Sequence, residues 1–258
     1  MIRNTTVVLF ALLTSLSGCA MDRSLAPPRE SELMTITVKV PKALKARTLE
    51  VMYRSPICKR ITSGASGQRI ELEGYNGIDV QLQQQGQSDL YEAKLPIDGG
   101  GACQWRLSDV VFGVAYRDPT RFGENVTYGA GGGVVVQFDH NRGLRSAGMP
   151  IEVEGNLMIK KDYYPWIDEE FLGPYKKTLS LAGEGDIYLG YQALQARQVY
   201  FEPVLHSGFA VYSAGPKIKK EGNHTAFTYP DGSTSANGRS KPDFRKLQAI
   251  RLAAEAQK

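Results

Sequence analysis

The stretch Val110-Val111-Phe112-Gly113-Val114-Ala115-Tyr116 decides the fold class of this chain. It is almost entirely apolar, which is typical of a strand that is covered on both faces. Val134-Val135-Val136-Gln137-Phe138 has the same character. The two runs predict central strands of a β-rich protein.

Shorter segments around these two runs alternate between apolar and polar residues. Ile36, Val38 and Val40 alternate with polar neighbours, which predicts a half-buried strand. Further strands are expected at 49–53, 69–73, 80–82, 91–95, 151–159, 178–181, 187–191, 198–202, 209–212 and 226–229. Turn-forming clusters separate them, at 98–101, 118–119, 129–133 and 229–233. This spacing predicts a mainly β fold, an immunoglobulin-like or related β-sandwich.

The domain prediction depends on the polar, glycine-containing segment 141–150. We expect a β-sandwich domain at 34–145 and a second β-rich domain at 146–258. The second one is expected to end in an α-helix. Ser240-Lys241-Pro242-Asp243 offers an N-cap and an early proline, and helical apolar spacing follows to about Glu255.

The N-terminal residues predict export. Arg3 precedes the apolar run 7–13, which is shorter than the roughly 20 residues that a spanning helix needs. Leu16-Ser17-Gly18-Cys19 follows it. Residues 1–18 are therefore predicted to be a signal peptide, and the cysteine placement resembles the lipobox of bacterial lipoproteins.

The lipobox resemblance implies that Cys19 carries lipid and anchors the chain to a membrane. Ala20 in place of an aspartate implies the periplasmic face of the outer membrane. Residues 19–33 are polar, contain Pro27-Pro28 and lack apolar periodicity, so they are predicted to be a tether.

Cys58 and Cys103 are the two remaining cysteines. In an oxidising compartment they are expected to form a disulfide, which the chain-entropy model values at on the order of 4 kcal/mol. By analogy with immunoglobulin domains, this bond could join two sheets. The alternative is a reactive thiol or a metal pair, but neither cysteine has a second Cys or His at ligand spacing.

Catalytic motifs are sparse. The sequence lacks Gly-x-Ser-x-Gly and His-Glu-x-x-His. His140, within Asp139-His140-Asn141, is either a general base or the exposed end of a strand. Gly129–Gly133 is followed by a strand and not by the helix of a phosphate site, which favours a flexible loop or hairpin tip. We expect no catalytic residues, no metal site and no cofactor.

The net charge of +4 comes without a block of basic residues, so a nucleic-acid partner is not expected. The unusual segment is Asp162–Phe171, which concentrates aromatic and acidic side chains around a proline. It can be read as a carboxylate pair of a glycosidase, a cation site, a partner-binding loop or a core anchor. The candidate partner-binding residues are Tyr163, Tyr164, Trp166, Asp168, Glu169 and Phe171.

Three stretches, taken with the lipobox, carry a resemblance to a known family. They are Tyr53-Arg54-Ser55-Pro56-Ile57-Cys58-Lys59, Leu95-Pro96-Ile97-Asp98-Gly99-Gly100-Gly101-Ala102-Cys103-Gln104-Trp105 and Lys161-Asp162-Tyr163-Tyr164-Pro165-Trp166. The chain resembles the lipoprotein immunity proteins that protect Gram-negative bacteria from phospholipase effectors of type VI secretion.

The resemblance implies a periplasm-facing protein, not itself an enzyme, that binds a secreted phospholipase toxin and blocks its active site. Two other classes stay open. One is a structural or assembly lipoprotein of the envelope without a toxin partner, and the other is an enzyme acting on envelope lipid or glycan. The partner surface is expected to include Asp162–Phe171 and the Gly129–Gly133 loop.

Overall fold

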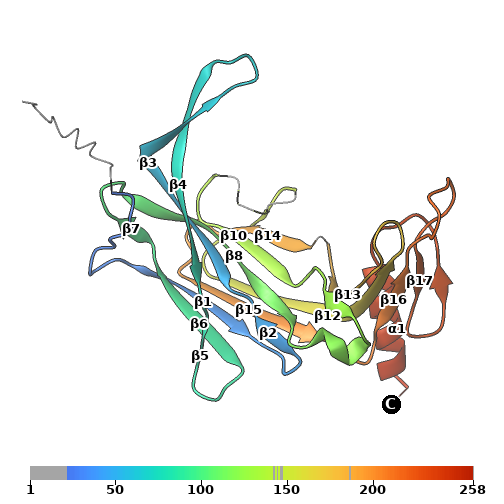
Figure 1. The fold of residues 1–258 in the computed structure, drawn as a ribbon. Helices are drawn as coiled ribbons and strands as arrows, with labels where there is room; N and C mark the ends of the chain where they lie inside the picture. The colour runs from blue at the N-terminus through green and yellow to red at the C-terminus, as the bar shows by residue number, and fades with distance from the viewer. Residues whose placement is uncertain (1–21, 142, 144, 146–147, 186, 258) are drawn as a thin grey trace, which may run out of the picture.

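The computed structural model describes residues 22–141, 143, 145, 148–185 and 187–257. The predicted signal peptide and Cys19 lie outside this range. The chain forms two β-sheets in a sandwich-like arrangement, followed by one C-terminal helix, α1 (Phe244–Glu255) (Figure 1). The predicted mainly β fold with a terminal helix is therefore confirmed. Among the described residues, no helix has the length and apolar character needed to cross a membrane.

The eight-stranded sheet is built around the long apolar strand that the sequence singled out. Its order is β11-β14-β10-β8-β3-β4, and β2 and β7 pair with β8. The bounds are β2 (Leu44–Ala46), β3 (Leu49–Ser63), β4 (Arg69–Val80), β7 (Asp98–Gly100), β8 (Trp105–Tyr116), β10 (Gly133–Gln137), β11 (Ile151–Glu152) and β14 (Tyr188–Gln192). Nearly every residue of β8 is buried, as the apolar run predicts.

The ten-stranded sheet has the order β18-β17-β16-β12-β15-β1-β6-β5, with β13 beside β12 and β9 beside β13. The bounds are β1 (Leu33–Lys39), β5 (Gln83–Gln84), β6 (Leu90–Pro96), β9 (Val126–Tyr128), β12 (Leu157–Glu170), β13 (Lys176–Gly183), β15 (Gln198–Leu205), β16 (Val211–Ala214), β17 (Ala226–Thr228) and β18 (Thr234–Ser235). A short 3-10 helix, η1 (Pro119–Phe122), precedes β9.

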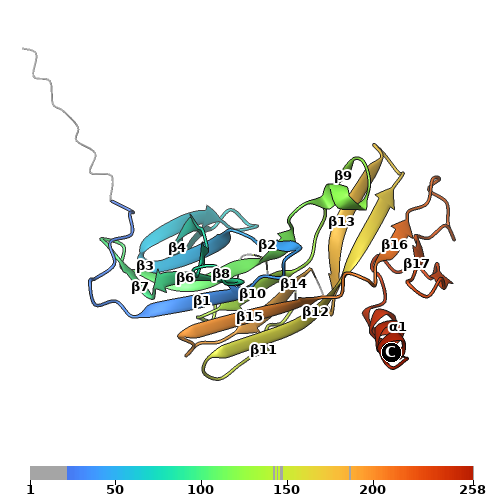
Figure 2. The same cartoon turned by 90° about the horizontal axis from the view of Figure 1, so that it is seen from below.

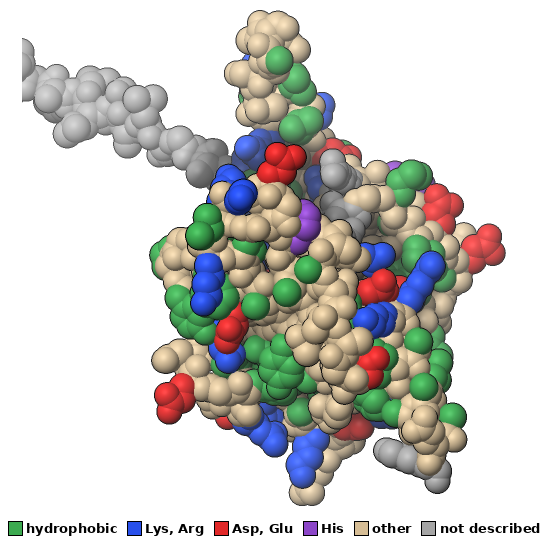
Figure 3. All heavy atoms as spheres, turned by 90° about the vertical axis from the view of Figure 1, so that its right-hand side faces the viewer, with side chains coloured by type: hydrophobic (Ala, Val, Ile, Leu, Met, Phe, Trp, Pro, Cys, Tyr) green, Lys and Arg blue, Asp and Glu red, His purple; other side chains and the backbone are tan. Residues whose placement is uncertain are grey.

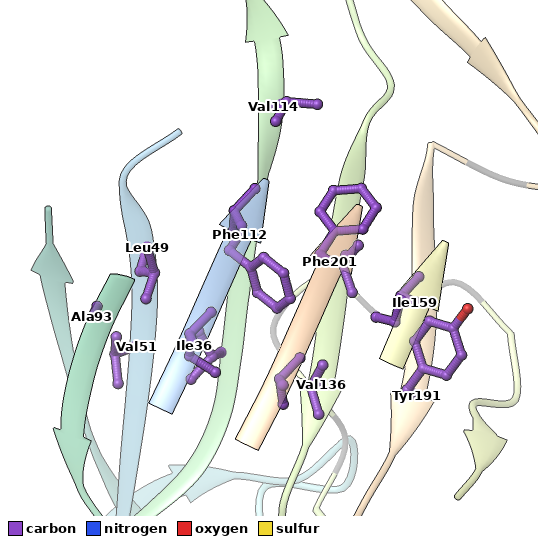
Figure 4. Packing of buried hydrophobic residues seen from close by; sticks show 14 of the residues in the cluster. Ile36, Leu49, Val51, Ala93, Phe112, Val114, Val136, Ile159, Tyr191 and Phe201 are labelled. Carbon is purple, nitrogen blue, oxygen red and sulfur yellow. The ribbon is translucent and has the colours of Figure 1, made fainter. Parts of the chain in front are cut away.

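The main core lies between the two sheets. Ile36 on β1, Phe112 on β8 and Phe201 on β15 are buried there (Figure 4). The rings of Phe112 and Phe201 meet edge to face with their centroids 6.0 Å apart. A second, smaller apolar cluster lies beneath α1 and includes Tyr164, Phe227 and Leu247.

Both sheets combine strands from the two halves of the chain. β1 pairs in parallel with β15, and β10 pairs in parallel with β14. The main core likewise holds residues from Met34 to Phe201. The boundary predicted near residue 145 therefore falls in a loop of the sandwich, and segments 34–145 and 146–258 do not form separate sheets. Polar composition marks a loop, but it carries no information about which strands pair across it.

Cys58 and Cys103 form the expected disulfide, with their Cα atoms 5.2 Å apart. Cys58 lies on β3, and Cys103 lies in the turn between β7 and β8. All three strands belong to the eight-stranded sheet, so the bond braces one sheet. The immunoglobulin analogy, in which the disulfide joins two sheets, does not apply.

The part of the predicted tether that is described lies against the sandwich. Leu25 packs on the main core, and the amide of Ala26 donates to Gly99 O at 2.9 Å. The amide of Ile97 donates to Glu32 O at 2.8 Å. Residues 22–32, which we call the N-terminal segment, therefore follow the surface of the body. A polar sequence without periodicity can still dock through its backbone, which explains the difference from the prediction.

Candidate functional site

Residues 162–170 of the aromatic and acidic segment form the second half of strand β12, and Phe171 follows it. The segment is therefore not a loop, and the alternative of a core anchor holds for its buried residues. Its side chains alternate between the two faces of the sheet. Tyr163 is only 3 % exposed and lies in the main core, while Tyr164 is fully buried in the cluster beneath α1. Neither tyrosine is available to a partner in this structure, since both are needed to fill the interior.

Trp166 and Asp168 share the face of β12 that carries Tyr164, and both are half-buried. They line a cavity of about 1190 Å³. Its other walls come from Gly129–Gly131, from Thr178 and Ser180 on β13, and from residues 238–245 before and at the start of α1. The fold thus brings together the two segments that the sequence singled out.

The Gly129–Gly131 wall is fixed by hydrogen bonds to β13. The amide of Gly129 donates to Leu179 O at 2.9 Å, and the amide of Leu181 donates to Ala130 O at 2.8 Å. The amide of Ala130 also donates to Ser180 Oγ at 2.9 Å. A Cβ on Gly131 would overlap Leu181 O, so the glycine permits this close approach. The segment is therefore fixed in place as a wall of the cavity, which differs from the flexible loop or hairpin tip that was expected.

A chain of hydrogen bonds orients the polar floor of the cavity. Trp166 Nε1 donates to Ser213 Oγ at 2.6 Å, and the Ser213 hydroxyl donates to a carboxylate oxygen of Asp168. Burial raises the pKa of Asp168; the bond from Ser213 opposes this, and the nearby charges of Glu170 and Glu169 add to it. The net result is a pKa above the ordinary value, because negative charge at this floor is poorly compensated.

Another wall of the cavity is formed by the residues that lead into α1. Arg239 Nη1 lies 3.0 Å from Asp243 Oδ2. Asp243 is the N-cap of α1 and accepts a bond from the amide of Lys246 at 3.3 Å. The cap is therefore three residues later than the Ser240 that the sequence suggested, while the predicted end at Glu255 is confirmed. On this end of the molecule, acidic and basic side chains lie next to one another (Figure 3).

The last two candidates lie outside the residues that line the cavity. Glu169 points to the opposite face of β12 and forms an ion pair with Lys177 at 2.9 Å. A hydrogen bond from Lys177 lowers the pKa of Glu169. Phe171 follows the end of β12 and packs against Tyr175, with the ring centroids 5.5 Å apart. Both remain partly accessible, so a partner contact there stays a prediction.

His140 and His206 differ in their surroundings. His140 is exposed in the loop after β10. Sequence reasoning missed His206, whose Nε2 lies 2.7 Å from Asp162 Oδ1. The pairing of β12 with β15 places Asp162 opposite Val204, and this brings the two side chains together across 44 residues of sequence. No local sequence motif predicts such a contact.

Among the described residues, no group of three or more His, Cys, Asp or Glu side chains is placed to hold a metal ion. Comparisons with models of known families, with curated proteins and with solved structures found no match to this chain. The functional argument therefore depends on the cavity and its position in the fold.

Proposed function

We propose that this protein is a lipid-anchored immunity protein of the bacterial envelope, which captures a secreted phospholipase toxin and blocks its active site. The observation that carries the proposal is the cavity in which Trp166, Asp168 and the Gly129–Gly131 wall meet. Tryptophan is among the residues most enriched at binding hot spots, and a concave site is suited to receive a protruding group of a partner.

The walls of the cavity suit a binding role because they are already ordered. Gly129–Gly131 is hydrogen-bonded to β13, and the Trp166 indole is held by Ser213. A preformed site loses little conformational entropy when a partner binds, so more of the contact energy appears as affinity. Blocking an enzyme by occlusion also needs no catalytic group on the blocking protein.

The position of the cavity supports the same proposal. The cavity is lined by residues next to α1, at one end of the sandwich, and the start of the described chain, drawn in blue, lies at the opposite end (Figures 1 and 2). If Cys19 carries lipid, the cavity faces away from the membrane and is open to a toxin in the periplasm. Anchoring near the toxin's substrate also raises the effective concentration of the antidote.

The test is a pull-down with the chain from residue 20 onward, using periplasmic extract of a producing strain that carries its own effectors. The blocking variant is Ala130→Arg, because Ala130 is exposed and lines the cavity. The matched control is Gln87→Arg, which adds the same side chain in the exposed turn before β6. We expect wild type and Gln87→Arg to retain a phospholipase, and Ala130→Arg to retain at least tenfold less.

Two results contradict the proposal. Equal retention of the lipase by Ala130→Arg would exclude the cavity as the binding site. Recovery of envelope-assembly proteins without any lipase would favour the alternative, a structural or assembly lipoprotein. A second measurement should agree with the first: cells that produce the lipase in their periplasm should survive with wild type and lose viability with Ala130→Arg.

A further inference from the structure

The hairpin of β3 and β4 extends beyond the body of the sandwich. β3 pairs with β8 only as far as Arg54, but its pairing with β4 continues to Ser63 opposite Arg69. Residues 56–75 are therefore a two-stranded arm, which stands clear of the rest of the molecule (Figures 1 and 3). An isolated two-stranded ribbon is marginally stable in water, so this arm depends on support at its base.

The base of the arm is braced by the disulfide and by a close backbone approach. Cys58, at the start of the arm, is bonded to Cys103 in the turn before β8. A Cβ on Gly74, opposite in the hairpin, would overlap Cys58 O, so only glycine permits this approach. The arm is therefore held firmly where it leaves the body.

The arm exposes four large apolar side chains among charged and small polar ones. Ile57, Ile61, Leu72 and Tyr75 are between 47 % and 57 % exposed. Lys59, Arg60 and Arg69 lie among them, together with the acidic Glu71 and Glu73. Lys59 and Arg69 each form an ion pair with Glu71, at 3.2 Å and 3.3 Å, while the Arg60 guanidinium lies 5.2 Å from the centre of the Tyr75 ring. Apolar groups flanked by long cationic side chains are typical of elements that rest on a phospholipid surface.

The N-terminal segment is fixed beside the base of this arm. Arg23 O accepts one bond from Trp105 Nε1 and one from Asn76 Nδ2 on β4, each at 3.0 Å. Trp105 is fully buried, so its indole gives this contact a rigid support.

The run Gly99-Gly100-Gly101 makes room for the next residues of the N-terminal segment. Gly100 has φ of +56°, and a Cβ there would overlap Ala26 O. The glycine run that the sequence marks as a turn therefore also holds the chain close to the sheet. As a result, residue 22 leaves the body at a defined place and not from a free tether.

This geometry sets the distance from the body to a lipid on Cys19. Three residues of chain connect Asp22 to Cys19, and three residues span at most about 11 Å. The six residues of the arm from Cys58 to Gly64 extend about 20 Å, at the usual rise per strand residue. A bilayer that holds a lipid on Cys19 is thus within reach of the arm.

We propose that the arm, residues 56–75, is a second membrane contact that rests on the phospholipid surface and orients the cavity away from it. The inference relies on the lipid anchor of the proposed function, but not on the toxin. The arm carries three basic and two acidic side chains, and this small positive excess favours a bilayer that contains anionic lipid.

The experiment uses the full lipidated protein in vesicles of phosphatidylethanolamine and phosphatidylglycerol, with a spin-labelled lipid as quencher. An environment-sensitive fluorophore is attached to Ile61→Cys on the arm or to Leu252→Cys on α1. The two positions are matched, since Ile61 is 57 % exposed and Leu252 is 56 % exposed. We expect at least threefold stronger quenching at position 61, and equal quenching at both positions would overturn the proposal.

A matched pair of glycine variants tests the role of the N-terminal segment in the orientation. Gly100→Ala introduces a Cβ that overlaps Ala26 O and displaces the segment. Gly86→Ala imposes the same backbone strain, because Gly86 has φ of +60°, but its Cβ meets nothing within 4 Å. Quenching at position 61 should fall to the level of position 252 in Gly100→Ala and stay unchanged in Gly86→Ala. Unchanged quenching in both would contradict the role of the segment.

The mass of the mature N-terminal peptide separates the two proposals. A peptide without acyl chains means that the anchor itself fails, and the proposed localisation fails with it. An acylated peptide with equal quenching at positions 61 and 252 means that only the arm proposal fails. In that second case, loss of lipase capture by Leu72→Ser would show that the arm binds protein instead.

Discussion

The imidazole Nε2 of His206 lies 2.7 Å from Oδ1 of Asp162, at the centre of a network that fastens α1 to the ten-stranded sheet. Gln248 Nε2 on α1 donates to the other oxygen of Asp162 at 2.8 Å. Gln248 Oε1 accepts from the Tyr164 hydroxyl at 2.5 Å, and Arg251 Nε donates to the Tyr164 oxygen at 3.1 Å. Because residues next to α1 line the cavity, this network also sets the position of one cavity wall.

Substitution Gln248→Leu should loosen α1. It leaves Asp162 and Tyr164 each without one hydrogen-bond partner in a partly buried place, which costs about 1–3 kcal/mol. Hydrogen exchange should become faster across Phe244–Glu255 while the core strands keep their protection. Leu252→Ala serves as the control, because Leu252 is exposed on the same helix and should change little. Equal exchange in the two variants would contradict the role of Gln248.

The attachment of α1 should also depend on pH. Burial raises the pKa of Asp162, but hydrogen bonds from His206 and Gln248 outweigh it, so the folded pKa lies below the ordinary value of 3.8. The carboxylate therefore contributes stability fully above pH 3.8, and this is lost as the pH falls through the folded pKa. The stability difference between wild type and Asp162→Asn should shrink as the pH falls below 3.8. A difference that grows in acid would contradict this.

Asp168 should give stability the opposite dependence on pH. Burial holds its pKa above the ordinary value, so the folded protein binds the proton more tightly than the unfolded chain does. The contribution of Asp168 to the free energy of unfolding therefore falls as the pH rises from the ordinary pKa through the raised pKa of the folded state. Asp168→Asn should be more stable than wild type at neutral pH, with the gain disappearing in acid. Urea unfolding at several pH values measures this, with Glu221→Gln in an exposed loop as the control.

Removal of the disulfide should weaken the chain and release the arm. The double variant Cys58→Ala/Cys103→Ala should lose about 2–5 kcal/mol of unfolding free energy, as is typical for a native disulfide. Hydrogen exchange should rise first in residues 56–75, because the bond braces the base of the arm. Reduced wild type should reproduce both changes. An unchanged urea midpoint would show that the sheet alone holds this region.

Much of the secondary structure could be predicted from the sequence, since the patterns that indicate strands and helices are local. Apolar alternation at Ile36, Val38 and Val40 reflects the two faces of a strand, and all three side chains are buried as expected. The helix up to Glu255 and the Cys58–Cys103 bond were predictable for the same kind of reason, from residue spacing and from cysteine count.

The candidate site could be predicted only in part. The sequence marked both Trp166 and the Gly129–Gly131 run, and the fold places them at one cavity. It could not show that Tyr163 and Tyr164 are interior residues, because an aromatic run has the same appearance in a binding loop and in a strand that is covered on both faces.

By itself, the sequence determined that this chain forms strands, where most of them lie, and that a helix closes it. Only the tertiary structure decided that β1 pairs with β15, that His206 meets Asp162, and that residues 22–32 dock on Gly99–Gly101. The reason is physical. Periodicity fixes which face of a strand is apolar, whereas the choice of neighbour depends on the packing of side chains that are far apart along the chain.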